Sequence, residues 1–237
     1  IAQVVFVGKE LELYAKADEL RSEWVVQITG TVQKRPEGMK NPNIITGDVE
    51  LKASHLEILA KAKELPFEKD TEINLDTYLD NLPLTLRTPR SQAIFKIQAE
   101  ILRLYREFLT KESFVEFQAP KLIGEDAEGG ADSFSVEYFG HTAHLAQSPQ
   151  LYKQIMVGVF ERVFAVGNVY RAEKHSTTRH INEYTSLDIE MGFIQDHTDV
   201  MLLETRLLRY IVKGLQVGSE KEIALLYGEN FKRFMKK

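Results

Sequence analysis

Hydrophobic and polar residues alternate over the first part of the chain in the pattern that short β-strands require. Candidate strands, rich in Val, Ile and Thr, occur at residues 3–7, 24–32, 48–53 and 56–59. A helix is predicted at 11–21, where apolar residues recur on one helical face, and 34–38 is typical of a turn. Short strands around a single helix fit a small barrel such as an OB-fold, and another small α+β domain fits equally well.

The middle of the chain changes from short strands to one long amphipathic helix. Residues 66–90 contain three prolines and many charges without a clear period, which predicts a hinge between two domains. Apolar residues then recur at three- and four-residue steps over 91–111, which predicts a helix with Ser91 as its N-cap. The run 113–120 favours a strand that ends at Pro120, because proline has no N–H to donate to a neighbouring strand.

The remaining residues predict two pairs of strands and two further helices. Strands are expected at 134–139, 144–146, 163–171 and 184–193, and helices at 148–160 and 199–215. Pro149 suits the first turn of the earlier helix, where a missing N–H costs little. We therefore expect an α+β fold.

Composition and charge narrow the class of protein. With 237 residues, of which 43% are hydrophobic and 27% charged, the chain can form one or two domains with a buried core. No stretch approaches the roughly 20 apolar residues that cross a bilayer, so no membrane partner is expected. The net charge of −5 argues against a protein that coats nucleic acid non-specifically. Cysteine is absent, which excludes disulfides, and without a targeting segment this predicts a cytoplasmic protein.

The densest group of cations and hydroxyls lies between the last two predicted strands, at residues 171–180. An arginine at the end of a buried strand is costly unless it meets an anion, so Arg171 needs a carboxylate or a phosphate. A structural pair with Glu173 would meet that need. A polyphosphate site is the alternative, because arginine binds phosphate bidentately and Arg179 and His180 follow in the loop. No glycine-rich phosphate loop is present, and without cysteine the histidines make a poor zinc site.

Together with three other segments, these residues resemble the aspartyl-tRNA synthetases of the class II family, in their archaeal and eukaryotic form. The matching segments are motif 1, formed by the helix before Ser113 and the run 113–122, then Glu128-Gly129-Gly130-Ala131, 145–154, and the strand–loop–strand of motif 2 at 163–193. Ser113 stands where motif 1 usually has glycine. The resemblance extends to about residue 215. It implies an incomplete OB-fold anticodon-binding domain at 1–65, a hinge at 66–90, and an incomplete catalytic domain with an antiparallel sheet at 91–237.

The resemblance implies an ATP site around motif 2. Arg171, as the catalytic residue, would bind the α-phosphate and an amino-acid carboxylate oxygen, and would stabilise the charge of the transition state. Glu173 would contact the adenine amino group and Tyr184 its ring, while Arg179 and His180 would hold the outer phosphates. The full ATP-binding set implied is Arg171, Ala172, Glu173, Arg179, His180, Ile181 and Tyr184. Mg²⁺ would accompany ATP, and no metal ligand is expected within this chain.

The same resemblance implies an aspartate site on the helix that starts near residue 148. The implied aspartate-binding residues are Glu128, Gln150, Leu151, Tyr152, Lys153 and Arg171. Glu128 and Gln150 would bind the α-ammonium group, with support from Asp188, and Lys153 would pair with the side-chain carboxylate. A buried ammonium favours an acid over an amide, so Lys153 favours aspartate over asparagine. Without the family context, a helix lysine is usually solvated.

Both ends of the chain depart from the family. The chain opens at Ile1 inside an apolar run rather than at methionine, and residues 216–237 do not match the family's continuation, whose motif 3 arginine is missing. We therefore expect a chain that is cut at both ends and that activates aspartate poorly by itself.

The resulting prediction is an aspartate–tRNA ligase, which forms aspartyl-adenylate from aspartate and ATP and transfers the aspartyl group to the 3′ end of tRNA. A homodimer through motif 1 is implied. Lys34 and Arg35 would either contact the tRNA backbone or form a solvated turn. An asparaginyl-tRNA synthetase and a non-catalytic module that binds tRNA or an amino acid are the alternatives.

Overall fold

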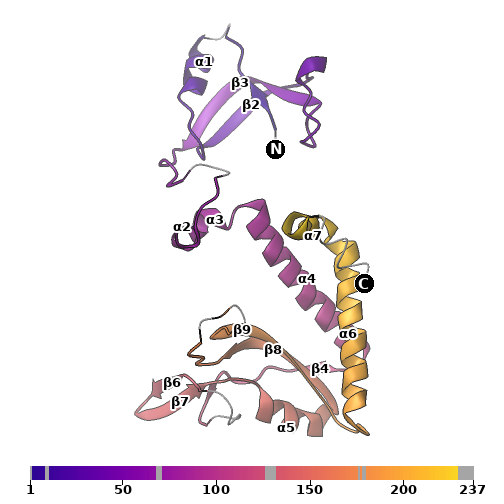
Figure 1. Cartoon of the computed structure of the whole chain (residues 1–237). Coiled ribbons are helices and arrows are strands. Elements are labelled where there is room, and N and C mark those ends of the chain that lie inside the picture. Colours follow the sequence, from indigo (N-terminus) through magenta and orange to yellow (C-terminus); the bar gives the residue numbers. More distant parts are fainter. Residues whose placement is uncertain are drawn as a thin grey trace. The chain divides into compact units, whose positions relative to one another are not determined.

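Two compact units make up the computed structural model, which describes residues 2–8, 11–67, 71–125, 132–175, 177 and 180–228. Unit 1 comprises Ile1–Tyr78 and unit 2 comprises Leu79–Lys237. The boundary falls within the stretch 66–90, in which the structure has two short helices, α2 (Leu75–Asp80) and α3 (Leu82–Thr85) (Figure 1).

Unit 1 contains an open three-stranded sheet in the part that the structure describes. Its order is β1 (Val4–Val5), β3 (Val49–Ala60) and β2 (Val25–Lys34), with β1 parallel and β2 antiparallel to β3. Helix α1 (Leu11–Asp18) packs on β3, and a 3-10 turn, η1 (Glu37–Met39), follows β2. The described strands do not close into the barrel that an OB-fold would complete.

A single long strand, β3, replaces the two strands predicted at 48–53 and 56–59. In the pairing with β2, Thr29 lies opposite His55 and Gly30 opposite Ala53, so Ser54 is an extra residue on β3. Such a β-bulge lets a strand continue while its alternation shifts by one position. The break in the hydrophobic pattern is therefore a bulge and not a turn.

In the described part of unit 2, the strands form two small sheets. The first has the order β4 (Val115–Glu116), β8 (Arg162–Tyr170) and β9 (Glu183–Met191), with β4 parallel and β9 antiparallel to β8. The second is antiparallel, in the order β5 (Leu122–Ile123), β7 (His141–Leu145) and β6 (Ser135–Tyr138). The strand predicted over 113–120 is thus limited to the two residues of β4.

Helices cover the β4-β8-β9 sheet on its two faces (Figure 1). On one face lie α4 (Pro89–Lys111) and α6 (His197–Gly218), and on the other lies α5 (Gln150–Phe160). The last helix, α7 (Glu220–Tyr227), packs against α4. Part of the tail 216–237 therefore belongs to the helical layer of unit 2.

The alternation of β8 and β9 separates an apolar face from a polar one. Opposite residues of an antiparallel pair share a face, so Phe164 and Ile189 point toward α4 and α6, where the main core of unit 2 lies. The other face bears Ala165 and Gly167 of β8 and the even-numbered residues 184–190 of β9, and we call it the site face. Helix α5 packs on the Val163 end of this face.

The first turn of α4 is capped by Thr88, and the prediction of Ser91 as the N-cap is wrong. The Thr88 side chain accepts a hydrogen bond from the Ser91 backbone N–H at 3.3 Å. Because Thr88 precedes Pro89, its backbone is held in the extended region that an N-cap residue adopts.

The last turn of α4 ends in a Schellman motif centred on Ser113. The Ser113 N–H donates to Thr110 O at 3.1 Å and the Phe114 N–H to Leu109 O at 2.9 Å. Both Phe114 and Leu109 are buried in the main core. Ser113 has φ 65°, in the left-handed region that favours glycine at this position of the motif.

Replacing Ser113 with glycine is therefore expected to stabilise unit 2. S113G should raise the free energy of unfolding by about 0.5–1 kcal/mol, because the Cβ that disfavours the left-handed backbone is removed. Urea denaturation should show a higher midpoint for the unit 2 transition with an unchanged m-value. S113A keeps the Cβ and should give no gain, and an equal shift for both variants would contradict the backbone explanation.

Candidate functional site

Arg171 follows directly after β8 and extends over the site face. Its backbone N–H donates to Asn182 O at 2.9 Å, so the pairing of β8 with the return strand continues past Tyr170. The guanidinium carbon lies 5.9 Å from the centroid of the Tyr184 ring, in a cation–π contact. Arg171 is only partly exposed and its Nε is buried. The structure thus places an arginine and an aromatic ring together at this end of the face.

The backbone around Arg171 is fixed by neighbouring segments. The Ala172 N–H donates to Asp132 O at 2.8 Å. With the Asn182 amide turned so that its nitrogen faces these carbonyls, the nitrogen donates to Arg171 O and Glu173 O, both at 3.1 Å. Glu173 is partly buried in this turn. These bonds hold the backbone at the start of the loop.

The outer residues of the predicted ATP set are less enclosed. His180 is exposed, and its Nδ1 lies 2.6 Å from Thr177 Oγ1. Ile181 is 56% exposed. Arg179, like Glu128 of the predicted aspartate set, lies outside the described residues.

Lys153 of α5 reaches the opposite end of the site face. Its Nζ lies 3.4 Å from Asp188 Oδ1 and 3.5 Å from Glu190 Oε2, and its side chain is 14% exposed. Ser186 Oγ donates to the other carboxylate oxygen, Asp188 Oδ2, at 2.5 Å. Lys153 is therefore not a solvated helix lysine, because its charge is held by two carboxylates in a largely buried position.

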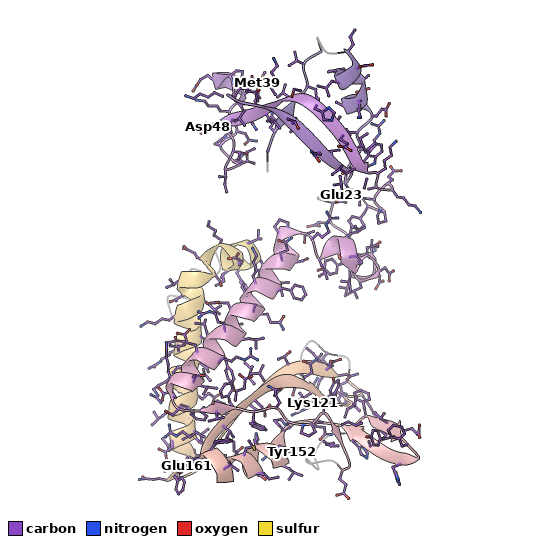
Figure 2. The ribbon with its side chains drawn as sticks, turned by 180° about the vertical axis from the view of Figure 1, so that it is seen from behind. Glu23, Met39, Asp48, Lys121, Tyr152 and Glu161 are labelled. Atoms are coloured by element: carbon purple, nitrogen blue, oxygen red, sulfur yellow. The ribbon has the colours of Figure 1, made fainter. Side chains whose placement is uncertain are left out.

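The other predicted aspartate residues of α5 have different surroundings. Gln150 begins the helix and is half-buried, whereas Leu151 is 53% and Tyr152 38% exposed. Leu151 is two residues from Lys153, which is about 200° around a helix, so the two side chains lie on different sides. Figure 2 labels Tyr152 on α5. Lys153 is the member of this group that enters the described ion cluster.

Sequence reasoning missed Glu190, Ser186 and Tyr105 as parts of the site. Glu190 and Ser186 could have been found from alternation, because they are two residues on either side of Asp188 and share its face. Tyr105 comes from α4, on the far side of the sheet, and no sequence signal connects it to Asp188.

Tyr105 links the helical layer to the strand that bears Asp188. Its hydroxyl donates to the Asp188 backbone carbonyl at 3.0 Å, and its ring contacts Phe164 edge-on at 5.7 Å between centroids. The side chain is 2% exposed, and this burial, with the nearby charge of Asp188, raises the pKa of the Tyr105 hydroxyl well above its usual value. Tyr105 is therefore a neutral donor that positions β9.

Lys153 and Arg171 lie at separate positions along the same strand pair. Asp188 is opposite Ala165, and the backbone of Arg171 lies six residues farther along, from where its side chain extends over Tyr184. One end offers an ammonium among carboxylates, and the other a guanidinium beside an aromatic ring. This arrangement suits an elongated ligand with a small charged group at one end and an anionic group next to a flat ring at the other.

Neither a metal cluster nor a membrane helix is found in the described part of the chain. There, no three His, Asp or Glu side chains come together as metal ligands would. None of the described helices is long and apolar enough to cross a bilayer.

The predicted tRNA contacts lie at the end of β2 in unit 1. Lys34 is exposed. Arg35 is 4% exposed, and its guanidinium donates through Nε to Val49 O at 3.0 Å and through Nη1 to Met39 O at 3.5 Å. Arg35 thus holds the turn after β2, whereas Lys34 presents its charge to solvent.

Residues 74–237 match the family model of the class II tRNA synthetases (D, K and N). An aspartate–tRNA(Asp/Asn) ligase of Deinococcus radiodurans is 47% identical over 209 residues, which is 86% of this chain and 46% of that protein. An aspartate–tRNA(Asp) ligase of Pyrococcus abyssi is 40% identical over 95% of this chain and 51% of its own length.

Solved structures agree with these sequence matches. Asparaginyl-tRNA synthetase from Pyrococcus horikoshii, complexed with asparaginyl-adenylate, has a TM-score of 0.83 at 30% identity, over 97% of this chain and 51% of that one. Aspartyl-tRNA synthetase from Entamoeba histolytica has a TM-score of 0.68 at 29% identity, over 86% of this chain and 44% of that one.

This chain belongs to the class II tRNA synthetases of the D, K and N group. It spans about half the length of the curated relatives that it matches. The family match includes residues 216–237, so the expectation that this tail departs from the family is wrong.

The hydroxyl of Tyr105 provides a test of how the site strand is held. Y105F should lower the free energy of unfolding of unit 2 by about 1 kcal/mol, because a buried hydrogen bond to the Asp188 carbonyl is lost. The measurement is the urea midpoint of the unit 2 transition. Y138F, at a tyrosine that is 47% exposed, should leave the midpoint unchanged, and equal effects of the two variants would contradict the role of Tyr105.

Proposed function

We propose that the protein is an aspartate–tRNA ligase. The single observation that supports this most is the largely buried ammonium of Lys153, which lies on the same face as the Arg171–Tyr184 pair. The Lys153 ammonium suits an amino acid with an acidic side chain, while a guanidinium beside an aromatic ring suits a nucleotide phosphate and its base. Relatives named as aspartate–tRNA ligases support the same choice.

Two steps follow from this assignment. In the first, a carboxylate oxygen of aspartate attacks the α-phosphorus of ATP, the new P–O bond forms, and the bond to the β-phosphate breaks with release of pyrophosphate. Arg171 would stabilise the charge on the α-phosphoryl oxygens. In the second step a terminal ribose hydroxyl of tRNA attacks the adenylate carbonyl carbon and loses its proton, and AMP leaves.

The remaining contacts of ATP and aspartate are proposed for the residues of the motifs. Tyr184 would stack on adenine and Glu173 would accept from its amino group. Ala172, Arg179, His180 and Ile181 would line the rest of the nucleotide, and Glu128, Gln150, Leu151 and Tyr152 the amino acid. ATP would enter with Mg²⁺, which would offset the charge of its phosphates.

The asparaginyl enzyme is the second candidate, because a structure of that specificity is similar in backbone. Asparagine offers Lys153 a neutral oxygen, whereas aspartate offers a full charge. Charged hydrogen bonds are stronger than neutral ones, so the Lys153 ammonium favours aspartate.

A methionine at position 153 tests the assignment. In the full-length protein with ATP and Mg²⁺, K153M should lower kcat/KM for aspartate-dependent pyrophosphate exchange by about thirtyfold or more. The reason is that a charge-assisted hydrogen bond contributes about 2 kcal/mol. K213M, on an exposed lysine of α6, is the matched control and should keep the wild-type rate.

Three outcomes would contradict the proposal. Exchange that depends on asparagine instead of aspartate would make the protein an asparaginyl enzyme. No exchange with either amino acid would favour the non-catalytic module. Unchanged kcat/KM for aspartate in K153M would remove Lys153 from the amino-acid site.

Unit 1 is proposed to bind tRNA, with Lys34 as one phosphate contact. K34A should weaken tRNA binding about fivefold and reduce the slope of log K against log salt by about 1, because one phosphate contact is lost. Filter binding at several salt concentrations measures both values. K34R keeps the charge and should behave like the wild type, and an unchanged salt slope in K34A would contradict the contact.

We also propose that the protein is a homodimer and lies in the cytoplasm. Ile94 and Phe95 of α4 are 51% and 54% exposed, and Val115 of β4 is 39% exposed, in the helix and strand of motif 1. Apolar side chains at these positions support a second copy as the partner. The cytoplasmic location rests on the cysteine-free sequence.

A further inference from the structure

A second lysine, Lys121, lies on the site face without having been assigned to the site by any motif. It stands between β4 and β5, and its backbone carbonyl accepts from the Ala146 N–H at 2.9 Å. Figure 2 labels Lys121 on the side of β8 and β9 that faces the β6–β7 hairpin. Its backbone is thus tied to the segment that leads into α5.

The side chain of Lys121 lies directly over Gly167 of β8. A Cβ at position 167 would be 3.2 Å from Lys121 Nζ and 3.3 Å from its Cε, closer than ordinary contacts. The absence of a side chain at 167 therefore gives the ammonium room to lie against the sheet. Gly167 is opposite Ser186, and Ser186 donates to Asp188, so the ammonium lies beside the Lys153 cluster.

The electrostatics couple Lys121 to Asp188. Burial lowers the pKa of the Lys121 ammonium, and the negative charge of Asp188 partly opposes that shift. Among the described residues, Lys121 Nζ has no hydrogen-bond or ion-pair partner. The cost of burying its charge is therefore offset through space, by the negative charge of Asp188.

The charges of the group formed by Lys153, Asp188 and Glu190 balance only when Lys121 is added to it. Lys153 is shared between Asp188 and Glu190, which gives one ammonium against two carboxylates. A ligand carboxylate that approached this group would meet a net negative charge. With Lys121 the group becomes neutral, and the ammonium of Lys153 can bind an anionic ligand.

We propose that Lys121 is a specificity-determining residue of the amino-acid pocket, an inference that rests on the function proposed above. Its ammonium offsets Asp188, so that Lys153 binds an acidic side chain in preference to the isosteric amide. A purely structural role for Lys121 would weaken the binding of both amino acids equally. If Lys121 determines specificity, its loss weakens the binding of aspartate more than the binding of asparagine.

The test compares the dissociation constants of aspartate and asparagine in the full-length protein by calorimetry. K121M should reduce the preference for aspartate about tenfold or more, because one favourable charge is removed from the pocket. K121R keeps the charge and should retain most of the preference. The ratio of the two constants within one variant does not depend on the fraction of folded protein.

A second variant leaves the lysine in place. G167A introduces a Cβ that pushes the flexible end of Lys121 away by a few tenths of an ångström, so the preference should fall by less than in K121M. An unchanged aspartate-to-asparagine ratio in K121M, or equal losses for both amino acids, would overturn the inference while the proposed function stands. If the wild-type protein does not prefer aspartate, the proposed function fails, and the role of Lys121 fails with it.

Discussion

The charge of Lys153 can exist in a largely buried position only because two carboxylates face it. Both come from β9, at alternate positions, and they reach the lysine only with the present register of β9 against β8. A slip of one residue would turn Asp188 and Glu190 toward the apolar layer of α4 and α6, where burying them would be costly. The pairing of the strands and the ion cluster therefore stabilise each other.

The apolar layer behind the sheet supports the same register from the other side. Phe164 and Ile189 pack among the residues of α4 and α6, and Tyr105 adds a directed bond to the Asp188 carbonyl. Apolar packing alone is tolerant of small shifts, whereas a hydrogen bond to one carbonyl selects one position. Helix α4, which bears none of the proposed substrate contacts, thus helps to place the carboxylate of Asp188 on the opposite face.

Much of unit 2 could be predicted from the sequence because its patterns are local. The alternation of β8 and β9 and the periodicity of α4 and α6 follow from one segment at a time. The bulge at Ser54 could not be predicted, because it depends on which residues of β2 lie opposite. The left-handed backbone of Ser113 could not be predicted from the residue type either, because serine does not favour that conformation. The one indication was that glycine usually stands at this position of motif 1.

Sequence motifs named Arg171 and Lys153 as candidate residues, and the structure places both on the site face. The neighbours that complete their surroundings could not be found from a motif. Aspartate and asparagine have nearly the same size and shape, so a backbone that fits one also fits the other. The similarity of this chain to an asparaginyl enzyme with a TM-score of 0.83 agrees with that reasoning. Under the proposed function, discrimination would then come from the charges around Lys153. A lysine whose charge is already paired with two carboxylates attracts a third one only weakly. The charged groups around Lys153 therefore matter as much as the lysine itself.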